Sequence, residues 1–394
     1  MAVAAVEGLV PTGPLRGVRV LDVSALGPGP FCSMLLADYG ADVIAVERPP
    51  QPEPGPEHVS RFFDRGKRVI TVDLRAAHGS ELIARLADQV DVFLEGYRPG
   101  TMERRGLGPD VLMARNPRLV YTRLTGWGQS GPYALRAGHD INYIAVGGVL
   151  GIIGDKSPVP PLNVLGDFAS GSVMAAMGTL LALFERERTG KGQVVDAAMA
   201  DGAALLLSAQ LAEHSRDIWA GRGRSLLSGG APCYGVYRCA DGAFVAVGAI
   251  EQKFYAALLS TLQVEDDWLA RQYDIETWPA GRARLERAFA TRSRAEWIEA
   301  FAAVDACVFP VLEVDELEDD PHVRARGTVV RRHGLLQAAP APRLSRTPAR
   351  SGPPALDHDD TIGVLHELGV PAEDVDRYVA SGTVVRERAA AVAT

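Results

Sequence analysis

Residues 17–47 read GVRVLDVSALGPGPFCSMLLADYGADVIAVE, and this segment carries the clearest signal of the fold class. Apolar, β-branched runs at Val18–Val23 and Asp42–Glu47 flank a helical pattern at Phe31–Tyr39. A strand, a helix and a second strand in this order predict a parallel pair joined by a crossover helix. The pattern continues with strand candidates at Val69–Leu74, Val90–Glu95 and Leu119–Leu124 and a helix at Ser80–Ala87. The first half therefore predicts an α/β domain with a parallel sheet covered by helices.

Beyond these strands the sequence predicts two long apolar helices. The first spans about Ala169–Arg186 and ends at the glycine-rich segment 189–192, TGKG. The second runs from about Asp201 to Ala220. Residues 221–230 then form a glycine-rich linker.

The pattern changes after this linker. Tyr234–Cys239 and Ala243–Val247 flank Asp241-Gly242, which is a strong hairpin signal. Predicted helices follow at Glu251–Leu262, Gly281–Ala290 and Arg294–Ala303, and Ser293 with Glu296 fits a capping box for the last of them. Antiparallel strands with helices indicate a second, smaller α+β domain at 231–330. We expect residues 315–354 to be an extended loop, and the final helix to span Thr361–Leu368.

Composition limits the class of protein. The 394 residues are 47% apolar and 23% charged, as in soluble globular chains, and the net charge of −8 argues against a nucleic-acid partner. Apolar stretches such as Val173–Phe184 are too short to span a membrane, and the N-terminus lacks the pattern of a secretory signal. The four cysteines lack a metal or disulfide spacing, which favours reduced cysteines and a cytoplasmic location. They are Cys32, Cys233, Cys239 and Cys307.

Several common motifs are absent from the sequence. The turn Gly27-Pro28-Gly29-Pro30 follows the first strand, but it lacks the dinucleotide-binding glycine spacing and its prolines have no N–H to offer a phosphate. There is no P-loop and no nucleophile elbow, and the scattered histidines predict no metal site.

A polar cluster remains as the candidate site. His139 and Asp140 precede an apolar segment, and Asp167 stands where the first long helix is expected to begin. Taken singly, Asp167 could be a helix cap and His139 a structural histidine. Together they supply two proton carriers, and the amides at the start of the helix could hold an oxyanion. This set suits proton abstraction next to a carbonyl group.

Long motifs also carry a family resemblance. Residues 138–154 (GHDINYIAVGGVLGIIG), 160–172 (PPLNVLGDFASGS) and 184–202 (FERERTGKGQVVDAAMADG) resemble the α-methylacyl-CoA racemases, a branch of the family III CoA-transferase superfamily. Further matches occur in order along nearly the whole chain, among them residues 95–100 (EGYRPG) and 247–251 (VGAIE).

The resemblance implies a fold and an assembly. A large Rossmann-like domain would be built from both chain ends, residues 1–220 and 331–394, with the small domain and a return linker at 231–330. Two subunits would interlock as a homodimer. The substrate would be an acyl-CoA, with coenzyme A as part of the thioester and no prosthetic group or metal.

The resemblance also implies roles for individual residues. His139 would act on one face of the substrate α-carbon and Asp167 on the other, Asp140 would orient His139, and Glu251 of the partner subunit would line the site. The implied coenzyme A contacts are Arg48, Val72, Arg75, Tyr97, Arg98, Arg104, Gly138 and Tyr143. Each of these arginines could instead be a solvated surface residue, because the chain is rich in arginine. Arg48 precedes a proline-rich stretch (49–56) that reads as an insertion, so Lys67 or Arg68 could take its place.

Three functions are compatible with this resemblance. The first is racemisation or epimerisation of 2-methylacyl-CoA thioesters by 1,1-proton transfer, with the enolate held by amides at the helix start. The alternative is a CoA-transferase, in which the aspartate at position 167 would be a nucleophile that moves CoA between carboxylic acids. A non-catalytic CoA-thioester binder is the third. His139 and Glu251 favour the racemase, because the resemblance implies that transferases lack this histidine.

Overall fold

The computed structural model describes residues 13–24, 27–49, 63–332, 334–353 and 360–384. The chain divides into two compact units. Unit 1 comprises Met1–Gly147, Leu162–Leu205 and Gly327–Thr394, and unit 2 comprises Gly148–Pro161 and Leu206–Arg326. Unit 2 thus contains two segments that the sequence analysis gave to the large domain or the linker. Arg222 ties these segments together, because its guanidinium donates to the carbonyls of Gly151 (2.9 Å) and Asp155 (3.0 Å).

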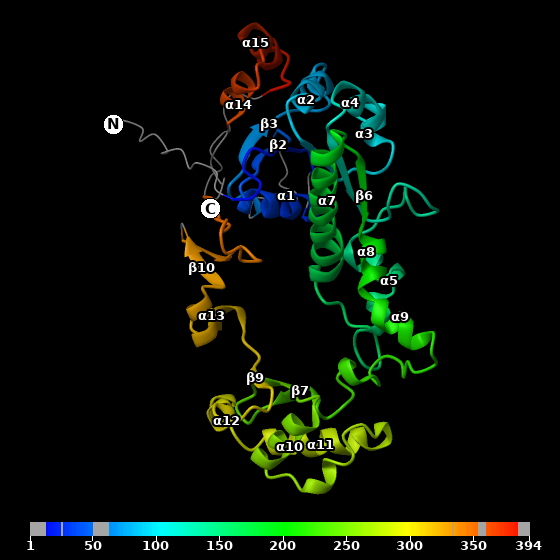
Figure 1. The fold of residues 1–394 in the computed structure, drawn as a ribbon, viewed down its shortest axis with the longest axis vertical. Helices are drawn as coiled ribbons and strands as arrows, with labels where there is room; N and C mark the ends of the chain where they lie inside the picture. Colours follow the sequence, from blue (N-terminus) through cyan, green and yellow to red (C-terminus); the bar gives the residue numbers. More distant parts are fainter. Residues whose placement is uncertain (1–12, 25–26, 50–62, 333, 354–359, 385–394) are drawn as a thin grey trace, which may run out of the picture. The chain divides into compact units, whose positions relative to one another are not determined.

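Unit 1 is built on a six-stranded parallel sheet (Figure 1). The strands follow the order β3-β2-β1-β4-β5-β6, so the order reverses between β1 and β4, as in doubly wound nucleotide-binding folds. Their bounds are β1 Arg19–Asp22, β2 Asp42–Glu47, β3 Arg68–Thr71, β4 Val92–Glu95, β5 Val120–Thr125 and β6 Val194–Ala198. The predicted α/β fold and five of its strands are confirmed. The sixth was missed because its sequence, VVDAA, contains an aspartate and two alanines, which are residue types depleted in strands.

Helices cover both faces of this sheet. Val20 and Leu21 of β1 are neighbours in sequence, yet each lies in a different buried cluster, because successive side chains of a strand point to opposite faces. Leu21 packs in the cluster that includes helices α2, α14 and α15, and Val20 in the cluster with α1 and α7. The helices of unit 1 are α1 Pro28–Asp38, α2 Gly79–Ala87, α3 Thr101–Arg104, α4 Pro109–Arg115, α5 Asp140–Val146, α7 Met174–Thr189, α8 Met199–Leu206 (which reaches the boundary with unit 2), α14 Thr361–Glu367 and α15 Ala372–Ala380.

The C-terminal segment returns to unit 1. Figure 1 shows α14 and α15 near β3 and α2, although they are far apart in sequence. The expected loop at 315–354 instead contains α13 (Pro321–Arg326) and a hairpin of β10 (Val329–Arg332) and β11 (Leu335–Ala338). The predicted last helix is α14, and α15, which follows it, was missed.

The first long apolar helix differs from the prediction in its start and in its type. It begins at Val164, and its first ten residues, Val164–Val173, form a π-helix (η2) that continues into α7. The whole element has 26 residues and so extends well beyond the apolar stretch Val173–Phe184; by length and composition alone it could cross a membrane, a test that the core helix of a soluble protein also passes. Its inner face packs against β5 and β6 of unit 1, where Thr179 Oγ1 lies 2.7 Å from Thr122 Oγ1.

Unit 2 has its own buried cluster around a three-stranded antiparallel sheet in the order β7-β8-β9. The predicted hairpin is confirmed as β7 Tyr234–Arg238 and β8 Phe244–Gly248, and β9 Val308–Pro310 completes the sheet. The capping box of α12 is present, since Ser293 N donates to Glu296 Oε2 at 2.8 Å. The helices are α6 Val149–Ile152, α9 Ser208–His214, α10 Gln252–Thr261, α11 Trp278–Phe289, α12 Arg294–Phe301 and α13, with 3-10 turns η3 Leu226–Ser228, η4 Asp266–Trp268, η5 Ile275–Thr277 and η6 Val314–Glu316.

Candidate active site

A cavity of about 400 Å³ lies at the carboxyl ends of β1, β4 and β5. Ser24, Gly96 and Thr125, at the ends of these strands, line it. This is the point at which the strand order reverses, where open α/β sheets bind their ligands. His139 and Asp167 line the same cavity, so the fold brings together the two proton carriers singled out from the sequence.

Asp167 is the fourth residue of the π-helix, and its carboxylate is partly buried. Burial raises the pKa of Asp167, and the negative charge of Asp140 adds to the rise. A hydrogen bond from Asn163 Nδ2 to Oδ2 (3.1 Å) and the nearby His139 act in the opposite direction. A carboxyl group with a raised pKa can serve as a proton donor as well as an acceptor.

Asp140 has a different partner from the one expected. Its side chain is only 7% exposed, and Oδ2 accepts a hydrogen bond from Asp167 N at 2.7 Å. Gly166 makes this approach possible, because a Cβ there would lie 2.4 Å from Asp140 Oδ2. Asp140 therefore positions Asp167, and no hydrogen bond joins it to His139 among the described residues. The same contact occupies the Asp167 amide, which we had expected to be free for an oxyanion.

His139 stands at the start of α5 with an exposed side chain. Its backbone N–H donates to Asn142 Oδ1 at 3.1 Å, which fixes the turn into the helix. The backbone is thus held while the imidazole remains accessible from the cavity that it lines.

Five of the predicted coenzyme A contacts line this cavity: Arg48, Tyr97, Arg98, Gly138 and Tyr143. The guanidinium of Arg48 reaches Tyr97, with 3.5 Å between Arg48 Nη2 and the Tyr97 hydroxyl. Tyr143 donates from its hydroxyl to the carbonyl of Gly138. The proline-rich stretch after Arg48 lies outside the described residues from position 50 on.

A buried carboxylate holds the loop that carries Tyr97. Glu95 is fully buried, and it accepts hydrogen bonds from Tyr97 N (2.7 Å) and Arg123 Nε (2.8 Å). Burial raises the pKa of Glu95, whereas these two donors lower it. The loop after β4 is therefore fixed to the framework of the sheet.

Three other predicted contacts do not line the cavity. The guanidinium of Arg104 donates a hydrogen bond to Thr101 Oγ1 at 3.2 Å. Arg75 is exposed, and its backbone N–H donates to the carboxylate of Asp73. Val72 is 1% exposed because it continues β3 with its side chain in the core of unit 1. Its side chain offers no surface to a ligand.

Lys67 and Arg68, the alternatives to Arg48, both form contacts within the protein. Lys67 has a fully buried side chain, whose Nζ donates to Pro30 O at 2.9 Å and to Asp64 at 3.1 Å. Arg68 forms an ion pair with Asp42 at 2.7 Å. These contacts give both residues structural roles.

Some residues of the cavity were missed by the sequence analysis. Arg136 lines it, with its guanidinium 4.9 Å from the centre of the Tyr133 ring, and Trp127 and Met199 line it too. No signal marked Arg136, because it is one of many arginines and precedes the recognised motif.

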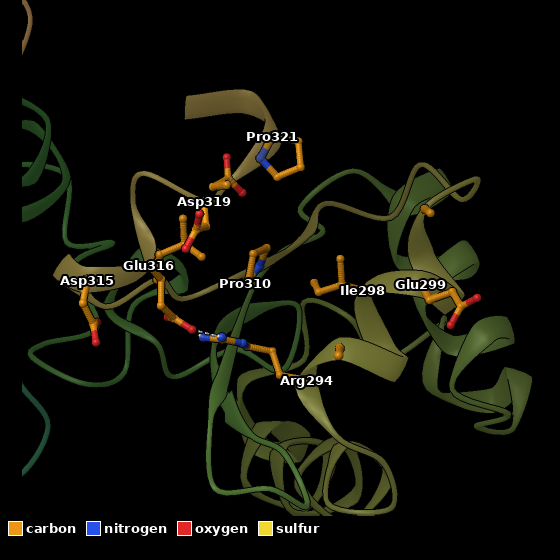
Figure 2. Close-up of a pocket in the computed structure, with 12 residues that line it drawn as sticks. Arg294, Ile298, Glu299, Pro310, Asp315, Glu316, Asp319 and Pro321 are labelled. Atoms are coloured by element: carbon orange, nitrogen blue, oxygen red, sulfur yellow. Dashed lines mark hydrogen bonds and ion pairs between the residues drawn. The ribbon is translucent and has the colours of Figure 1, made fainter. Parts of the chain in front are cut away.

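Glu251 lies in unit 2, immediately before α10, with an exposed side chain. Unit 2 also has a cavity of its own, of about 750 Å³ (Figure 2). Figure 2 shows Arg294 extended toward Glu316, and their ion pair lowers the pKa of Glu316 to about 2. Glu316 is thus held ionised, and no histidine lines this cavity. The pairing of a histidine with an aspartate of raised pKa is found in the cavity of unit 1 instead.

The four cysteines are free, and burial raises the pKa values of their thiols. Among the described residues, no group of three or more His, Cys, Asp or Glu side chains is arranged to hold a metal ion.

Comparison with known proteins gives consistent matches. The family model for CoA-transferase family III matches residues 15–360. The chain is 43% identical to Alpha-methylacyl-CoA racemase of Homo sapiens over 370 residues, covering 92% of this chain and 95% of that protein. It is 43% identical to the Mus musculus protein of the same name, covering 93% and 98%. A crystal structure of a CAIB/BAIF family protein from Brucella suis superposes with a TM-score of 0.77 at 26% identity, covering 91% of this chain and 100% of that one.

Proposed function

The chain belongs to CoA-transferase family III, and we propose that it is a racemase that inverts the α-carbon of 2-methylacyl-CoA thioesters. The observation that carries the proposal is that His139 and Asp167 line one cavity at the switch point of the sheet. The likeness to two mammalian racemases supports the same activity.

The chemistry needs two proton carriers on opposite faces of one carbon. In one direction, neutral His139 removes the α-proton, and the electron pair of the C–H bond moves into the enolate of the thioester. Protonated Asp167 then delivers a proton to the other face. In the reverse direction the carboxylate of Asp167 removes the proton and the imidazolium of His139 returns one. The raised pKa of Asp167 supports this assignment, because it brings the carboxyl group closer to the range in which it can give a proton.

We assign the coenzyme A moiety to the positively charged side of this cavity. Arg48 and Arg98 line it, and a guanidinium binds phosphate oxygens in pairs. Coenzyme A belongs to the substrate, and no prosthetic group enters the reaction. The free cysteines support a cytoplasmic location, where thiols stay reduced.

We further propose that the active form is an interlocked homodimer in which Glu251 of the partner subunit lines the site. Large apolar side chains lie exposed along one face of α7, which is unusual for a helix of a soluble monomer. They are Met177, Leu180, Leu181 and Phe184. A second copy of the chain would cover them.

A CoA-transferase is the second candidate, because Asp167 lines the cavity and could attack a thioester carbonyl. His139 in the same cavity favours racemisation, since a nucleophilic aspartate does not need a second proton carrier opposite it.

The test is incorporation of solvent deuterium at the α-carbon of one enantiomer of a 2-methylacyl-CoA, followed by NMR in D₂O. The proposal predicts exchange and loss of optical purity with no other acid present. CoA transfer that appears only when a free carboxylate is added, without exchange in its absence, would establish the transferase instead.

A further inference from the structure

The π-helix that carries Asp167 contains two fully buried serines, Ser170 and Ser172. Each hydroxyl donates to the carbonyl five residues earlier: Ser170 to Leu165, and Ser172 to Asp167 at 2.8 Å. The two serines therefore make the same contact within the helix. Short π-helical segments are frequent at functional sites.

Among the described residues, the Ser170 hydroxyl has no partner outside the helix, but Ser172 differs. Its hydroxyl also lies 2.7 Å from the carbonyl of Pro28, in the first turn of α1, so its single proton is shared between two acceptors. This turn lines the cavity, and a Cβ at Gly27 would lie 3.8 Å from Asp167 Oδ2. Ser172 thus joins the backbone of Asp167 to the wall that faces its carboxylate.

The turn is itself anchored from the other side. Buried Lys67 donates to Pro30 O at 2.9 Å and lies 3.9 Å from Asp22, the last residue of β1. Asp22 also accepts a hydrogen bond from Ser33 of α1. These contacts hold the start of α1 in place against β1.

The peptide groups on the two sides of Asp167 are both held by side chains. Asp140 Oδ2 accepts from its N–H at 2.7 Å, and Ser172 donates to its C=O at 2.8 Å. We propose that Ser172 is a positioning residue of the racemase, which sets the Asp167 carboxylate against the α1 turn so that it reaches the α-carbon from the face opposite His139. This inference rests on the proposed function.

The test compares Ser172→Ala with Ser170→Ala, the matched control that removes an equally buried hydroxyl and an equivalent contact within the helix. The readout uses the enantiomer that His139 deprotonates, in D₂O. After deprotonation, deuterium arrives either from Asp167 with inversion or back from His139 with retention, and NMR with chiral analysis gives the ratio of the two products. A loss of folded enzyme lowers both products equally and leaves their ratio unchanged.

We expect Ser172→Ala to lower inversion by about ten- to a hundredfold, as for a reacting group displaced by a fraction of an ångström to 1 Å, and to raise the ratio of retention to inversion. The KM for the thioester should stay near the wild-type value. Ser170→Ala should keep the wild-type ratio. Should Ser172→Ala fail to fold, Ser172→Cys and Ser170→Cys form the same comparison, because a thiol keeps the volume but is a weak donor.

A wild-type ratio in the Ser172 variant, or an equal change in both variants, would overturn the inference. Absence of α-deuterium exchange in the wild-type protein would refute the proposed function and this inference together. Because the wild type is measured first, that failure is told apart from a failure of the Ser172 inference alone.

Discussion

The Asp167→Asn substitution should abolish inversion and at the same time stabilise the protein. Asp167 is a partly buried carboxylate beside the buried Asp140, and its pKa is raised first by burial and then by that neighbouring charge. A raised pKa means that the folded state disfavours the ionised form relative to the unfolded state. An asparagine keeps an oxygen for the hydrogen bond from Asn163 and removes the charge.

The size of the stability gain in Asp167→Asn depends on how far the Asp167 carboxylate is exposed to water. Because water screens much of the penalty at a partly exposed carboxylate, we expect a gain of about 0.5–1.5 kcal/mol in the free energy of unfolding at neutral pH. For a chain of this size that is a rise of about 2 °C in the thermal midpoint.

The dependence on pH has a defined sign. Above the folded pKa of Asp167 the carboxylate is ionised in both states, so the wild type carries the full penalty. As the pH falls through that pKa toward the ordinary value of an aspartate, the folded protein takes up the proton first and the penalty disappears. The advantage of Asp167→Asn should therefore be largest near neutral pH and vanish in acid. Thermal unfolding of both proteins across this pH series is the assay. A variant that is less stable at neutral pH, or an advantage that grows in acid, would show that the ionised Asp167 carboxylate does not destabilise the folded protein.

Three further predictions concern the site and its surroundings. His139→Ala should lower the rate of inversion by about 10²–10⁴, the usual effect of a placed acid or base, and an unchanged steady-state rate would make His139 structural. Arg98→Ala should raise KM about tenfold with a small change in kcat, since it removes binding that is equal in ground and transition states; Arg115→Ala, whose arginine pairs with Asp88, is the control that should leave both constants unchanged. Phe184→Glu should weaken the proposed dimer, seen by light scattering as a shift toward monomer at low protein concentration, and an unaltered dimer would place the interface elsewhere.

The fold was largely predictable because its strands carry a strong local signal. Parallel strands buried on both faces appear as continuous apolar runs, and five of the six strands were found in this way. The π-helix at Val164–Val173 was not predictable, because its apolar pattern also fits an α-helix. Within this π-helix, Ser172 donates a hydrogen bond to Pro28, which lies 144 residues away in sequence. A contact over that distance leaves no pattern in the local sequence.

The site was predictable in its residues more than in its contacts. His139 and Asp167 stand out as polar residues in apolar surroundings, but their convergence on one cavity depends on the strand order. The resemblance implied that Asp140 orients His139, whereas in the structure the carboxylate of Asp140 accepts from Asp167 N. The side chain of Val72 lies in the core of unit 1, and a motif match does not tell which face of a strand a side chain occupies.

The proposed mechanism places His139 and Asp167 on opposite faces of one carbon. Following α-deuterium exchange from each enantiomer of a 2-methylacyl-CoA separately, with the His139→Ala and Asp167→Asn variants, tests this placement. With the two proton carriers on opposite faces, each variant should still exchange one enantiomer without inverting it, and the two variants should exchange opposite enantiomers. If both variants exchanged the same enantiomer, or either exchanged both, the two residues could not be the opposed proton carriers.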